Sequence, residues 1–228
     1  MDLNPINLLV RVPIVLLALT VHEFAHAYSA YRMGDPTAYR QGRLSLNPLK
    51  HLDPLGAICL MFAPIGWAKP VPINPLNFRD RRRGILVSTA AGPISNLAQA
   101  VLFALLLRLV VLFGGSLGGL LGDRGETAYA ALVLLGFVAV IINVGLAVFN
   151  CLPLYPLDGF HIALQLMRPE SQGRFAQTAP LGPYAILALV LVGSVGHVHV
   201  LNALVTPPAK VLLVYLAGFP RELVERLL

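Results

Sequence analysis

Long apolar stretches, with few polar positions between them, dominate the chain. Four strong segments cover residues 7–31, 85–113, 128–150 and 181–205. The third carries no charge, and the ionisable groups of the fourth are two histidines. A helix needs about 20 mostly apolar residues to span a bilayer. The pattern therefore predicts an all-α, polytopic membrane protein built as a bundle of transmembrane helices.

Two weaker apolar stretches complete the pattern. Residues 55–67 are interrupted by Pro64 and Gly66 and are too short to cross a bilayer alone. Irregular backbone is stable at membrane depth where protein buries it, so we expect this stretch to be a short re-entrant segment. Residues 211–219 follow Pro207 and Pro208 and are expected to form a half-span or an interfacial helix.

No internal repeat or separate soluble region interrupts these segments. We therefore expect one membrane-embedded domain over residues 1–228, with a core at about 7–167 and C-terminal helices at about 181–219. Only 12% of the residues are charged, against about 25% in soluble domains. A multi-pass protein of the cell membrane is the localisation that this composition predicts.

The basic residues are distributed unevenly and predict the orientation. Nine lysines and arginines lie between positions 32 and 83, whereas residues 114–127 contain Arg124 alone. Cytoplasmic loops carry the excess of lysine and arginine, so residues 32–83 should face the cytoplasm. The net charge of +6 is then explained by topology and by contact with anionic lipid, and no nucleic-acid partner is needed.

A motif for metal chemistry lies within the first apolar segment, at His22-Glu23-Phe24-Ala25-His26. Side chains four apart share one face of a helix, so both imidazoles can reach one metal ion, and the glutamate can act as a base on a metal-bound water. Ionisable groups within a membrane helix usually mark function. The alternative is that the histidines are hydrogen-bonded core residues and Glu23 faces an aqueous cavity. Because a removable signal peptide has no use for these groups, we expect the segment to be retained.

A third ligand is expected, because catalytic zinc usually has three protein ligands. Asp158 is a candidate, since it follows the uncharged segment after a break that contains Pro153 and Pro156. Such a break can direct the carboxylate into the bundle. Asp158 could equally cap a helix that begins at Gly159, and these residues alone leave both possibilities open.

Together, the two motifs resemble the site-2 protease family of intramembrane zinc metalloproteases. The stretch from Asn150 to Gly159 is similar to the family's second motif, which ends in Leu-Asp-Gly, and residues 46–54, 66–72 and 91–96 also look family-like. The resemblance implies that His22, His26 and Asp158 bind Zn²⁺ and that Glu23 is the catalytic acid and base. It also implies that the amide of Asn150 lies near the scissile carbonyl.

The resemblance is to a compact form of that family, because the sequence contains no PDZ-like insert between the motifs and no CBS-like domain. It implies hydrolysis of peptide bonds in or near transmembrane segments of membrane proteins, within the lipid bilayer. The alternative function is a metal transporter or a metal-sensing membrane protein, which could use the same ligands. Transporters often contain repeated halves, and none is detectable here. The sequence leaves the oligomeric state open.

Other polar residues are given structural interpretations with functional alternatives. Asn96, Gln99 and Asn143 are expected to form interhelical hydrogen bonds, with Asn96 also a candidate for lining the substrate path. His161 is interpreted either as a group near the metal or as a helix-surface residue. His51 and Asp53 are expected to have loop or capping roles.

Overall fold

The computed structural model describes residues 5–53, 56, 68–120, 122–195 and 200–228. Most of these residues are helical, and none forms a β-strand; one antiparallel bridge joins Leu52 and Ala68. Three helical stretches are long and apolar enough to cross a membrane, namely Val10–Arg32, Arg81–Gly114 and Asp123–Asn150. The all-α membrane prediction is confirmed. The expected re-entrant segment at 55–67 lies almost entirely outside the described residues.

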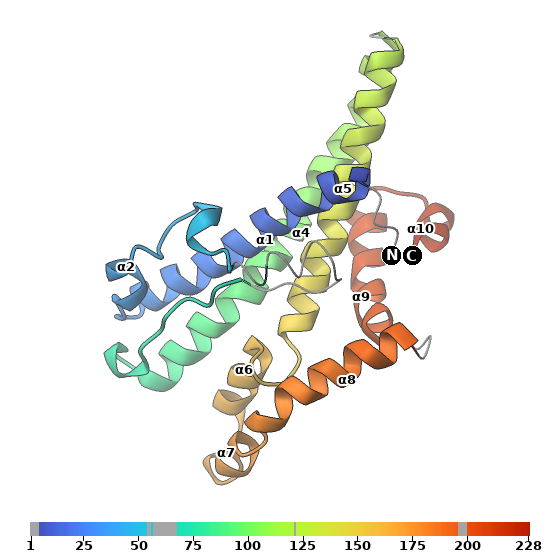
Figure 1. The fold of residues 1–228 in the computed structure, drawn as a ribbon. Coiled ribbons are helices and arrows are strands. Elements are labelled where there is room, and N and C mark those ends of the chain that lie inside the picture. Colours follow the sequence, from blue (N-terminus) through green and yellow to red (C-terminus); the bar gives the residue numbers. More distant parts are fainter. Residues whose placement is uncertain (1–4, 54–55, 57–67, 121, 196–199) are drawn as a thin grey trace.

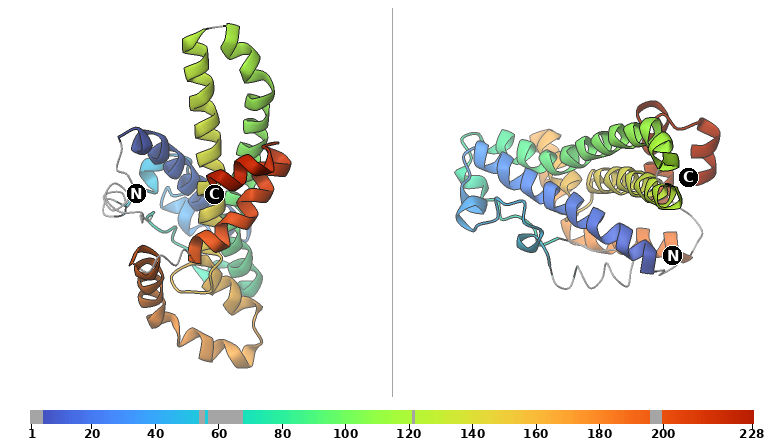
Figure 2. Two further views of the ribbon diagram at one scale, coloured as in Figure 1. Left: turned by 90° about the vertical axis from the view of Figure 1, so that its right-hand side faces the viewer. Right: turned by 90° about the horizontal axis from the view of Figure 1, so that it is seen from above.

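The central structure is an antiparallel pair formed by α4 (Arg81–Leu120) and α5 (Asp123–Asn150). With 40 residues, α4 is about 60 Å long, roughly twice the thickness of the hydrocarbon core. The third long helix, α1 (Pro5–Arg32), packs across the lower part of this pair and contacts both helices. The far end of the α4–α5 pair therefore projects beyond the rest of the molecule, as Figures 1 and 2 show.

Small side chains allow these helices to approach closely. Ala100 and Ala104 of α4 are fully buried, as is Val144 of α5. The hydrophobic effect does not drive membrane helices together within lipid, so their association depends on close van der Waals packing, which small side chains permit. By contrast, α4 exposes Leu102, Leu109 and other large apolar side chains. In a membrane protein this exposed surface faces lipid.

The C-terminal part consists of shorter helices. They are α6 (Asp158–Leu166), α7 (Pro169–Ala176), α8 (Gly182–Val195), α9 (Val200–Val211), a π-helical turn (Leu212–Leu216) and α10 (Arg221–Leu227). The apolar segment expected at 181–205 is thus divided between α8 and the beginning of α9, and residues 196–199 between them are outside the described part.

The last apolar stretch continues directly from α9. Helix α9 contains Pro207 and Pro208, and membrane helices tolerate proline where neighbouring groups satisfy the freed carbonyls. The following turn carries Leu213, which is fully buried in the same core as α4 and α5. This stretch therefore packs into the bundle.

Short segments connect α1 to α4: α2 (Thr37–Arg40) and the 3₁₀ turns Pro48–Lys50 and Pro75–Asn77. Asp35, which is fully buried, joins the two ends of this connection. It accepts hydrogen bonds from Thr37 N at 3.0 Å, Asn74 N at 2.7 Å and Asn77 Nδ2 at 2.7 Å. The chain just after α1 and the chain just before α4 consequently lie together, at the end of the bundle opposite the α4–α5 turn.

This juxtaposition gives a prediction about topology. In a background with both native cysteines replaced by serine, Gln41→Cys and Asp80→Cys should react with an impermeant thiol reagent from the cytoplasmic side. Glu126→Cys, near the α4–α5 turn, is the matched control and should react from the opposite side. Labelling of Gln41→Cys and Asp80→Cys from outside would reverse the proposed orientation.

Candidate metal centre and active site

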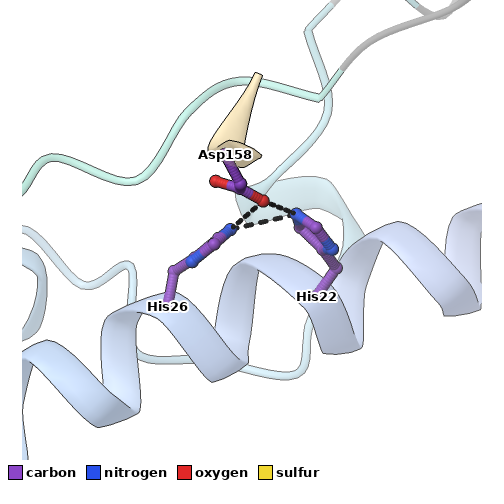
Figure 3. A group of neighbouring side chains, drawn as sticks. All are labelled: His22, His26 and Asp158. Atoms are coloured by element: carbon purple, nitrogen blue, oxygen red, sulfur yellow. Dashed lines mark hydrogen bonds and ion pairs between the residues drawn. The ribbon is translucent and has the colours of Figure 1, made fainter. Parts of the chain in front are cut away.

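Three side chains from two distant parts of the sequence converge on one point. His22 and His26 lie one turn apart on α1, and Asp158 is the first residue of α6. The two Nε2 atoms are 3.0 Å apart, and each lies 3.3 Å from Asp158 Oδ2. Figure 3 shows the carboxylate above both imidazoles. One ligand atom from each residue lies within 4.8 Å of the other two, a spacing that one metal ion can bridge.

The other ring nitrogen of each histidine has an oxygen partner. His22 Nδ1 is 2.6 Å from Asn96 Oδ1, and His26 Nδ1 is 2.7 Å from the carbonyl oxygen of Ser88. The Asn96 amide is oriented by the Ala18 carbonyl, because Asn96 Nδ2 donates to that oxygen at 3.3 Å. Both partner oxygens can only accept, so each Nδ1 carries a proton, and in the neutral imidazole the lone pair is then on Nε2.

The arrangement of these atoms suits the binding of a cation. Two lone pairs and a carboxylate oxygen face one another at close range, and Asp158 Oδ2 is buried without a hydrogen-bond donor among the described residues. With neutral imidazoles these atoms repel one another, and either a proton or a metal ion between them removes the repulsion. Metal-bound histidines usually donate their second N–H to an oxygen in this way. The residues therefore fit a zinc ion with two nitrogen ligands and one oxygen ligand.

Asn96 is connected to a third helix. Its Nδ2 donates to Asn143 Oδ1 at 3.1 Å, and both asparagines are completely buried. The expected interhelical hydrogen bonds are thus confirmed for this pair. The contact between Asn96 and His22 is the part that the sequence did not reveal, because the two residues are far apart along the chain.

Gly92 lies in the family-like segment 91–96, and no pattern in the sequence indicates that this glycine has a role of its own. A Cβ atom placed there would lie 2.3 Å from His26 Nε2 and 2.6 Å from His22 Cε1. Only glycine allows the α4 backbone to approach the two imidazoles this closely. Gly92 therefore allows the close approach of α4 to the imidazoles of His22 and His26.

The break between α5 and α6 directs Asp158 as the sequence suggested. Gly159 is required there, because a Cβ atom on it would lie 2.3 Å from the carbonyl oxygens of both Cys151 and Leu152. Leu157 occupies the N-cap position of α6, and Asp158 is its first helical residue. Asp158 is therefore not the N-cap, and its carboxylate faces the histidines instead.

A cavity of about 640 Å³ opens beside the three converging residues. Glu23, Asn150 and His161 also line it, together with apolar side chains that include Leu19, Leu146 and Phe149. Glu23 Oε2 accepts a hydrogen bond from Val71 N at 3.0 Å. His161 thus lies on the cavity wall. His51 is buried elsewhere, and its Nε2 is hydrogen-bonded to the Ser45 carbonyl oxygen at 2.7 Å.

Comparison with known proteins distinguishes an enzyme from a transporter. Residues 115–193 match the model of peptidase family M50. A putative zinc metalloprotease, YwhC of Bacillus subtilis (strain 168), is 39% identical over 187 residues, which cover 81% of this chain and 82% of that protein. The chain belongs to peptidase family M50. It is an intramembrane zinc metalloprotease, and the resemblance to the site-2 protease family is confirmed.

More distant relatives agree with this assignment. The putative zinc metalloprotease Rip2 of Mycolicibacterium smegmatis is 30% identical over 182 residues, and Rip2 of Mycobacterium tuberculosis (strain H37Rv) is 31% identical over 181 residues. In each case the match covers 77% of this chain and 64% of the mycobacterial protein. No solved structure matches.

The M50 assignment identifies the cofactor, the membrane location and the class of substrate, but it does not assign roles to single residues. Zinc is the cofactor, the protein crosses the membrane several times, and its substrates are membrane proteins. The family-model match contains Asn150 and Asp158, but it begins at residue 115 and therefore does not include His22, Glu23 and His26. The roles of these residues in this chain therefore rest on the geometry described above.

Proposed function

We propose that His22, His26 and Asp158 hold the zinc ion and that Glu23 transfers protons during cleavage of peptide bonds in or near transmembrane segments. The observation that carries this proposal is the convergence of two Nε2 atoms and one buried carboxylate oxygen, with both Nδ1 atoms bonded to oxygen. A zinc ion supplies Lewis acidity and lowers the pKa of water bound to it.

Glu23 is assigned to proton transfer and not to metal binding. It neighbours His22 on α1, but its Oε2 points to the backbone of Val71. We assign proton transfer to the other carboxylate oxygen, Oε1. Glu23 takes a proton from the attacking water as the carbon–oxygen bond forms, and it donates this proton to the amine as the carbon–nitrogen bond breaks. The carboxylate returns to its initial state at the end of the cycle.

Asn150 is proposed to stabilise the negative charge that develops on the substrate carbonyl oxygen. Its Nδ2 donates to the Leu146 carbonyl oxygen at 3.0 Å within α5. A primary amide nitrogen has two hydrogens, so one donor is left for the substrate. Asn150, the last residue of α5, would thus donate its second hydrogen to the substrate carbonyl oxygen.

The cavity walls indicate how a transmembrane substrate binds. Leu19, Leu146 and Phe149 lie on α1 and α5, so the residues that flank the scissile bond should be apolar. A helical substrate keeps its carbonyl groups in internal hydrogen bonds, because lipid offers no other partner. The substrate must therefore unwind locally before its carbonyl can reach the metal and Asn150.

The test is cleavage of transmembrane peptides by the purified protein, with and without a zinc chelator. We expect cleavage that the chelator abolishes and that added zinc restores. Zinc flux into proteoliposomes should be measured with the same preparation. Chelator-insensitive cleavage would contradict the proposed zinc chemistry, and zinc flux without cleavage would support the transporter instead.

A further inference from the structure

An extended segment, residues 69–73, runs beside Glu23 on its way from the connecting region to α4; we name it the strap. Its backbone N–H groups are held at two alternate residues. Lys69 N donates to the His51 carbonyl oxygen at 2.8 Å, and Val71 N donates to Glu23 Oε2 at 3.0 Å. The residue before the strap, Ala68, pairs with Leu52 in the antiparallel bridge. The position of the strap therefore determines the surroundings of the proposed proton-transfer residue.

The side chain that anchors the strap is Arg43. Its Nη2 donates to the Lys69 carbonyl oxygen at 2.5 Å and reaches the Pro70 carbonyl oxygen at 3.4 Å. Arg43 is only 7% exposed, and its Nε has no hydrogen-bond partner among the described residues. Within the same part of the chain it forms no ion pair with a carboxylate. Burial of a guanidinium that has no carboxylate partner is unfavourable. We therefore expect its contacts with the two strap carbonyls to have a role other than filling space.

One peptide group connects Arg43 to Glu23. The Pro70 carbonyl and the Val71 N–H belong to the same planar unit, and in a trans peptide they point in opposite directions. Arg43 contacts this unit on the oxygen side at 3.4 Å and bonds the carbonyl of the preceding peptide group, that of Lys69, more closely; Glu23 bonds the unit on the nitrogen side. If the plane rotates, the N–H direction rotates with it. The guanidinium thus fixes the direction of the hydrogen bond that holds Glu23 Oε2.

We propose that Arg43 is a positioning residue for peptide cleavage, acting on Glu23 through the Pro70–Val71 peptide group. The proposal rests on the proposed function of Glu23. Arg43 contacts the strap backbone and none of the three proposed zinc ligands. Its loss frees the strap and leaves the Glu23 carboxylate without a fixed donor, while the zinc site remains intact. Groups that orient a metal site from outside the ligand set typically change activity by about 10–100-fold.

The first experiment compares Arg43→Gln, Arg43→Lys and the control Arg40→Gln, an exposed arginine on α2. We expect Arg43→Gln to lower kcat by about 10–100-fold with KM and zinc content unchanged, and Arg43→Lys to restore part of the rate. Arg40→Gln should behave as the wild type. A normal kcat in Arg43→Gln, or a rise in KM alone, would overturn the proposal.

A second experiment removes the hydrogen bond without changing Arg43. Val71→Pro deletes the N–H that binds Glu23, whereas Val71→Ala shortens the side chain and keeps the N–H. We expect Val71→Pro to have a kcat about 10-fold or more below that of Val71→Ala, with equal zinc content. Equal rates in the two variants would overturn the proposal, even if Arg43→Gln fails to fold.

A double-mutant cycle shows whether Arg43 acts through Glu23. If it does, Arg43→Gln should have little effect on the residual rate of the Glu23→Gln enzyme. A loss in that background as large as in the wild type would assign Arg43 an independent role and overturn the proposal. Failure of the proposed function is distinguishable, because in that case Glu23→Gln itself would cleave normally.

Discussion

Replacement of Glu23 by glutamine should lower the rate of peptide cleavage by about 10²–10⁴-fold, the usual value of general acid–base assistance, while the protein keeps its zinc. Glutamine has nearly the same shape, and its amide oxygen can still accept the hydrogen bond that Val71 N donates to Glu23 Oε2. It cannot take up the proton of the attacking water. The rate should fall because of lost chemistry and not because of lost structure.

Zinc content, thermal unfolding and cleavage should be measured on one preparation of the Glu23→Gln protein. Near wild-type cleavage would remove Glu23 from the mechanism. A loss of zinc together with activity would instead show that Glu23 supports the metal site.

Replacement of Asp158 by asparagine should weaken zinc binding by at least about 100-fold, since even groups outside the ligand set cost 10–100-fold, and cleavage should be lost with the metal. Asparagine keeps the shape of the side chain but removes the negative charge that faces both Nε2 atoms at 3.3 Å. Metal analysis after dialysis against a weak chelator measures the effect directly.

Asp123→Asn is the matched control, because this aspartate is also at the start of a helix but is exposed at the far end of the bundle. It should retain zinc and activity. Unchanged zinc retention in Asp158→Asn would show that the third ligand is a different residue.

Long apolar stretches and the spacing of polar residues made most of the fold and the three converging residues predictable from the sequence. The spans were visible because lipid requires long apolar helices, and His22 and His26 were visible because a spacing of four places side chains on one face. Asp158 was recognisable as a carboxylate after a proline-containing break, but the choice between ligand and helix cap needed the position of α6 relative to α1.

The contacts around these residues could not be predicted in the same way. Asn96 bonds His22, and Arg43 bonds the strap, across separations in sequence that leave no periodic signal. Gly92 is needed only because two imidazoles from another helix lie against it. The course of α9 through Pro207 and Pro208 likewise gives no local signal, because it is a helix packed against α5 in spite of the local preference of proline.

The distribution of the converging residues over the sequence has a consequence for the timing of activity. His22 and His26 enter the membrane with the first helix, whereas Asp158 follows only after α4 and α5. During synthesis, the first helix therefore carries two of the three proposed zinc ligands before the third has been made. On the proposed ligand set, the proteolytic centre can be completed only after α1, α4 and α5 have all been synthesised.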